Sequence, residues 1–67
     1  MDIETLHLLA IRSFERIRTR CEFLKIYSYT EEEGNFAFYG LYKCKRRFMV
    51  KKVIIDPDGE IVAVITL

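Results

Sequence analysis

Few residues in this 67-residue chain are suited to acid–base or nucleophilic chemistry. The only histidine is His7, and the sequence around it supplies neither a group to orient a general base nor a substrate pocket. The carboxylates of Asp56, Asp58 and Glu60 lie close together, but they flank a proline and a glycine in a pattern typical of a turn. Their spacing does not match a calcium-binding loop, and the three glycines form no phosphate-binding loop. We therefore expect a protein that is not an enzyme and that requires no metal or cofactor.

The two cysteines, Cys21 and Cys44, are too few for the paired ligands of a zinc motif. Two interpretations fit them: buried free thiols that act as small hydrophobic side chains, or a disulfide between a helix end and a strand. Cytosolic proteins usually keep their thiols reduced, although hyperthermophile proteins are an exception. The composition, rich in Ile, Glu, Lys and Arg with no Gln or Trp, resembles that of proteins from hot environments. The sequence favours free thiols and leaves the disulfide open.

Basic residues form two groups that could contact nucleic acid. The first, Arg12, Arg16 and Arg20, has the spacing of a ridge along one helix. The second lies within residues 43–52 and consists of Lys43, Lys45, Arg46, Arg47, Lys51 and Lys52. However, 11 basic residues are balanced by 10 acidic ones, and the pI near 7.8 is below the value above about 9 that is typical of polyanion-binding domains. Nucleic-acid binding is therefore the second hypothesis, and charged strand edges that discourage aggregation are the simpler interpretation.

An amphipathic helix is the first element expected to position these residues. Asp2 is a suitable N-cap. The apolar residues that recur at steps of three and four are Ile3, Leu6, Ala10, Phe14, Ile17, Cys21 and Leu24. Residues 23–30 are rich in aromatic and β-branched types, which favour strands. We place the helix at 3–20 and the first strand at 23–30; the alternative is a helix that continues to Tyr27 and leaves three strands.

The rest of the chain predicts an antiparallel meander. A polar loop at 31–35 leads to a second strand at 36–44, and a third strand spans 47–55. Asp-Pro-Asp-Gly at 56–59 is the clearest turn, and the last strand covers 60–67. The prediction is one α+β domain over 1–67, with an N-terminal helix packed on one face of a three- or four-stranded antiparallel sheet. The N-terminus is acidic and no apolar run approaches the roughly 20 residues of a membrane span, so we expect a cytoplasmic protein with no membrane partner.

The strands carry apolar residues on both faces, whereas a single helix can cover only one of them. A chain of this size also has a marginal core, since domains below about 70 to 80 residues rarely stabilise themselves fully. Both observations favour a homodimer, formed through the uncovered sheet face. The residues we assign to that interface are Tyr39, Leu41, Met49 and Val53. The first hypothesis is thus a small interaction or regulatory protein that acts as a homodimer and that could also bind another protein.

Overall fold

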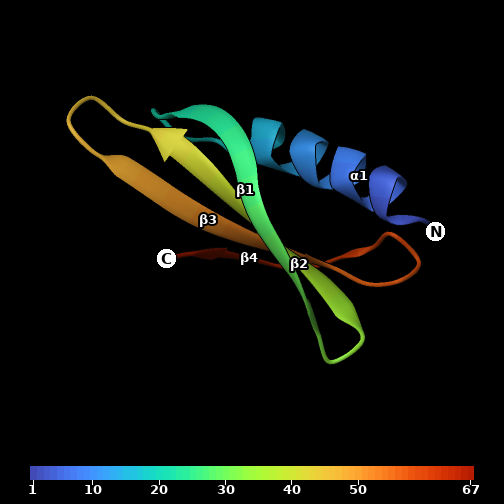
Figure 1. Cartoon of the computed structure of the whole chain (residues 1–67). Coiled ribbons are helices and arrows are strands. Elements are labelled where there is room, and N and C mark those ends of the chain that lie inside the picture. The colour runs from blue at the N-terminus through green and yellow to red at the C-terminus, as the bar shows by residue number, and fades with distance from the viewer.

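The computed structural model describes residues 1–67 and places one helix on one side of a four-stranded sheet (Figure 1). The elements are α1 (Ile3–Arg16), β1 (Glu22–Glu32), β2 (Asn35–Lys43), β3 (Phe48–Ile55) and β4 (Ile61–Thr66). The strands are antiparallel and lie in the order β1-β2-β3-β4. The predicted α+β meander is confirmed with four strands, and the alternative of a helix that reaches Tyr27 is wrong.

The helix begins as expected but ends early. A side-chain oxygen of Asp2 accepts a hydrogen bond from the Thr5 amide at 2.8 Å, which caps the first turn and lowers the pKa of Asp2. At the other end Ile17 is already extended, with φ −66° and ψ 125°, so the predicted end at residue 20 is wrong. The Thr19 hydroxyl accepts from the Cys21 amide at 3.2 Å, a local bond that competes with helical pairing. Ile17 and Cys21 still pack against the core from non-helical backbone, which explains why the apolar spacing continues beyond the helix.

The two hairpins at the helix N-terminal end have defined turns. β1 and β2 extend further than predicted and leave only Glu33 and Gly34 between them, rather than a loop over 31–35. Both residues have positive φ, 51° and 81°, as a type I′ turn requires. The predicted turn at 56–59 is present: one Asp56 carboxylate oxygen accepts from the amides of Asp58 and Glu60, each at 2.9 Å.

The hydrophobic core lies between α1 and the sheet. Its buried members are Leu6, Ala10, Phe14, Phe38, Tyr42, Val53 and Ile55. The Phe14 ring lies directly over Gly40, where a Cβ atom would come within 2.7 Å of a ring carbon. Tyr42 donates a 2.7 Å hydrogen bond to the Phe14 carbonyl near the end of α1, and burial raises the pKa of the Tyr42 phenol to about 12. This bond connects the last turn of the helix to β2, near the C-terminal end of that strand.

The hydrophobic core contains few residues for a chain of this length. Only 9 of 67 residues are buried, and the accessible surface is 4871 Å². A monomeric protein of 8.0 kDa is expected to expose roughly 4450 Å². The isolated chain therefore exposes more surface than a folded monomer of its mass usually does.

A disulfide joins Cys21, just before β1, to Cys44, just after β2. Neither cysteine is a free thiol, so the favoured interpretation of the sequence is corrected. The bond closes a loop over a separation of 23 residues and fixes the chain where it leaves α1 and enters the sheet.

Replacing Tyr42 by phenylalanine should lower the free energy of unfolding by about 1–2 kcal/mol, because the Phe14 carbonyl loses its buried donor. The ordinary phenol pKa of 10.0 applies to the unfolded chain and about 12 to the folded chain, so this contribution is complete below pH 10 and is lost as pH rises towards 12. Urea unfolding at a series of pH values should show a shallower decline for Tyr42→Phe than for wild type. Equal slopes would show that the phenol is not buried as described.

Reducing the disulfide should lower the free energy of unfolding by about 3 kcal/mol, because the unfolded chain regains the freedom of the closed loop. The Cys21→Ser/Cys44→Ser variant should unfold at the same urea concentration as the reduced wild type. If reduction left the urea midpoint unchanged, the crosslink would contribute nothing to stability.

Candidate functional site

The candidate site is the outer face, the side of the sheet that α1 does not touch. Residues paired directly across neighbouring strands lie on the same face, so the register identifies its members. Its larger apolar side chains are Tyr27, Tyr39, Leu41, Phe48, Val50, Ile54 and Ile65. Tyr27, Phe48 and Ile65 are respectively 50%, 58% and 40% exposed. No other element of the chain packs over this face (Figure 1).

The structure divides the predicted interface set between the two faces. Tyr39 and Leu41 lie on the outer face, where Leu41 pairs with Val50. Val53 is fully buried in the core and Met49 packs against it, so their assignment to the interface is wrong. The incorrect assignment arose from the register between β2 and β3. A shift of one residue moves every side chain of a strand to the opposite face, and the loop between β2 and β3 determines that register.

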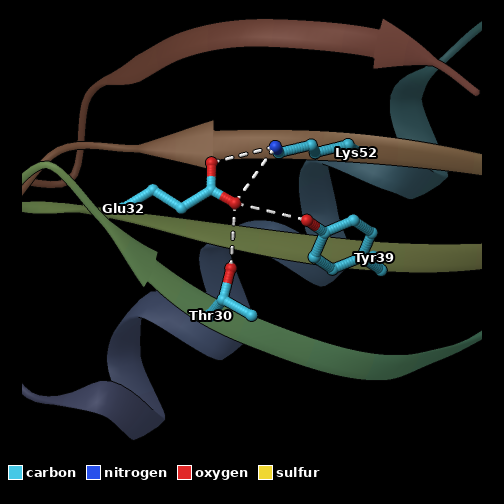
Figure 2. A network of polar contacts seen from close by, with 4 residues as sticks. All are labelled: Thr30, Glu32, Tyr39 and Lys52. Atoms are coloured by element: carbon cyan, nitrogen blue, oxygen red, sulfur yellow. Dashed lines mark hydrogen bonds and ion pairs between the residues drawn. The ribbon is translucent and has the colours of Figure 1, made fainter.

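A polar network extends from the middle of the outer face to the end of β1 (Figure 2). The Lys52 ammonium is 2.9 Å from one Glu32 carboxylate oxygen. The other oxygen accepts hydrogen bonds from the hydroxyls of Thr30 at 3.1 Å and Tyr39 at 3.3 Å. The hydrogen bond between Lys52 and Glu32 lowers the pKa of Glu32 and raises that of Lys52. The two charges are thus paired with each other, leaving neither as an isolated charge on this face.

The opposite end of the outer face is hollow and mainly apolar. A shallow hollow of about 560 Å³ is lined here by Tyr27, Phe48, Val50 and Leu67, and around the sheet margin by Arg47, Met49 and Thr66. The Lys43 ammonium lies 4.4 Å from the centre of the Phe48 ring, a cation–π contact at its margin. The outer face therefore combines an apolar surface with one paired charge network, and Lys25, opposite Leu41 on β1, adds a cation.

Charges are segregated along the length of the molecule. In a meander, the β2–β3 loop lies at the same end as the segment between α1 and β1, and the disulfide joins the two. This basic end contains seven cations and two acidic residues, Glu15 and Glu22. The cations are Arg16, Arg18, Arg20, Lys43, Lys45, Arg46 and Arg47. The opposite, acidic end contains Asp2, Glu4, Glu31, Glu32, Glu33, Asp56, Asp58 and Glu60. The net charge is only +1, but the basic and acidic residues are concentrated at opposite ends of the molecule.

The structure rearranges the predicted nucleic-acid residues. Arg20 lies beyond the end of α1, so the helical ridge of Arg12, Arg16 and Arg20 is wrong. Arg16 and Arg20 instead join the loop cations at the basic end. Lys51 and Lys52 lie in the middle of β3 and have partners on opposite faces: Thr66 at 2.7 Å and Glu32 at 2.9 Å. Sequence reasoning missed the segregation because it depends on which loops share an end, although the blocks of like charge were visible.

His7 belongs to the core side rather than to the outer face. Its ring packs edge-on against Phe38 at 5.8 Å. No group of three or more His, Cys, Asp or Glu side chains is placed to hold a metal ion. α1, the one helix, is neither long nor apolar enough to cross a membrane. Comparison of the chain with family models, curated proteins and solved structures gives no match.

Proposed function

We propose that this is a small non-enzymatic association protein that forms a homodimer through its outer face. The observation that carries the proposal is an apolar sheet face that no part of the chain covers. Sheets that pack face to face bury such surfaces in a layer about 10 Å thick. A second copy offers the same surface and satisfies a two-fold contact, in which each patch meets its own equivalent.

The size and composition of the outer face support this proposal. The molecule measures 36 Å by 19 Å in its two longer dimensions, so a flat contact on its broad side is at most about 700 Å², slightly less than the roughly 800 Å² per partner of a standard interface. Tyrosine and phenylalanine, the types enriched at interfaces, occur here as Tyr27, Tyr39 and Phe48. Glu32 and Lys52 are paired with each other, so neither enters the contact as an isolated charge.

A second candidate function is binding of nucleic acid at the basic end. The observation in its favour is the cluster of seven cations around the disulfide, none of which forms an ion pair within the chain. Such a cluster can follow a phosphate backbone without reading bases. The pI of the whole chain is near neutral because eight of its ten acidic residues lie at the other end of the molecule.

Leu41→Glu should weaken the face-to-face contact, because it places a carboxylate, between Val50 on β3 and Lys25 on β1, in the surface that the dimer buries. We expect the dissociation constant to rise about 30-fold or more. Leu8→Glu is the matched control, since Leu8 is 61% exposed on α1, away from the outer face. In sedimentation equilibrium Leu41→Glu should lower the average mass and Leu8→Glu should not. A wild type that stays at 8.0 kDa at high micromolar concentration would contradict the proposal.

Binding to a DNA or RNA oligonucleotide, measured at several salt concentrations, tests the second function. Phosphate contacts release counterions, so affinity should fall steeply with salt. Lys45→Glu, at the basic end, should reduce the slope of log affinity against log salt by about 1 or more. Lys51→Glu, in the middle of β3, should leave the slope nearly unchanged. Absence of binding even at low salt would exclude this function.

A further inference from the structure

The two edges of the sheet are built differently. β1 and β4 are the edge strands. β1 contains two register shifts and four charged residues, Glu22, Lys25, Glu31 and Glu32. Bulges and charges of this kind discourage a sheet from pairing with another chain. β4, Ile-Val-Ala-Val-Ile-Thr over Ile61–Thr66, has no charge and no proline. It contains one register shift near its start and carries none of the other protections of β1.

β4 is also exposed on both faces. α1 contacts β1, β2 and β3 but not β4. Val62 and Val64 are 54% and 49% exposed, and Ile65, on the outer face, is 40% exposed. A face-to-face dimer would cover the outer face alone, so it would leave Val64 in water.

The backbone of β4 presents unpaired groups. The Leu67 amide donates to the Val50 carbonyl at 3.0 Å, so Leu67 points towards β3. Because the direction alternates along an antiparallel strand, the amides and carbonyls of Val64 and Thr66 point away from the sheet. They form a row of donors and acceptors ready to pair with another strand.

We propose that β4 pairs antiparallel with β4 of a second copy of this chain, about a two-fold axis perpendicular to the sheet. The two four-stranded sheets then form one continuous sheet, with both copies of α1 on the same face. A strand without charges meets no like charge when it pairs with itself. Main-chain hydrogen bonds supply the contact, as in other cases of strand addition.

The bipolar charge distribution favours a second copy as the partner. Antiparallel pairing places the acidic end of one copy beside the basic end of the other. Asp58 and Glu60, in the turn before β4, would then lie near the partner's end that carries Arg46 and Arg47. Parallel pairing would instead bring like charges together, which is unfavourable.

This edge interface is separate from the outer face, so each can exist without the other. If the proposed function also holds, the two interfaces together give a tetramer in which two continuous sheets pack face to face. The expected mass of wild type is then four times 8.0 kDa. Disrupting either interface should halve that mass.

Hydrogen exchange provides the first test. The amides of Val64 and Thr66 should exchange at least about tenfold more slowly as protein concentration rises, because pairing protects them. Amides of β1 that point away from β2 are the internal control and should stay fast. Fast exchange at Val64 and Thr66 at every concentration would overturn the proposal.

The second test uses Val64→Pro, which removes an amide that points away from β3 and leaves the β3–β4 ladder intact. Val64→Thr is the matched control, since it keeps the amide and the β-branched shape. Val64→Pro should halve the mass relative to Val64→Thr. Val64→Lys keeps the backbone amide but adds a charge to this edge strand, and it should also halve the mass relative to Val64→Thr. It provides the test if the proline variant fails to fold.

The outcomes separate the two proposals. A lower mass for Leu41→Glu but not for Val64→Pro or Val64→Lys supports the outer-face dimer and overturns edge pairing. A lower mass for the β4 variants but not for Leu41→Glu supports edge pairing and overturns the outer-face dimer. Combining Val64→Pro with Leu41→Glu should give 8.0 kDa; a larger species would contradict both.

Discussion

The organisation of this protein depends on the limited cover that one helix gives to a four-stranded sheet. A helix about 10 Å in diameter spans roughly two inter-strand spacings, and therefore three strands, since neighbouring strands lie about 4.8 Å apart. α1 contacts β1, β2 and β3, so it leaves β4 and the whole outer face without cover from the chain. Because the strands carry apolar residues on both faces, this leaves hydrophobic surface in water.

Three interactions hold α1 and the segment that follows it against the sheet. The Tyr42 hydroxyl bonded to the Phe14 carbonyl, the close approach of the Phe14 ring to Gly40, and the Cys21–Cys44 disulfide all lie towards the basic end. They fix the C-terminal end of α1 on the sheet and gather the loop cations in one place. The same topology brings both other hairpins and the helix N-terminus to the acidic end. The order and direction of the strands therefore determine both where α1 is fixed to the sheet and how the charged residues are distributed between the two ends.

The sequence predicted the features that depend on local chemistry. The Asp2 cap, the turn at 56–59 and the four strands follow from residue types within a few positions of one another. The end of α1 could not be predicted in this way, because Ile17 and Cys21 keep a helical spacing in the sequence but pack against the core from non-helical backbone. The side of the sheet on which Met49 and Val53 lie could not be predicted either, because it depends on the register between β2 and β3, which the loop between these strands determines. The uncovered face could be anticipated from composition, but its members required the pairing of the strands.

Association through the outer face is tested most directly by an isotope-filtered NOE experiment on a mixture of labelled and unlabelled protein. If the outer faces of two copies pack together, intermolecular NOEs should connect the methyl groups of Leu41 and Val50 to side chains of the outer face in another copy. Detection of intramolecular NOEs alone, at a concentration at which the protein is fully folded, would contradict it.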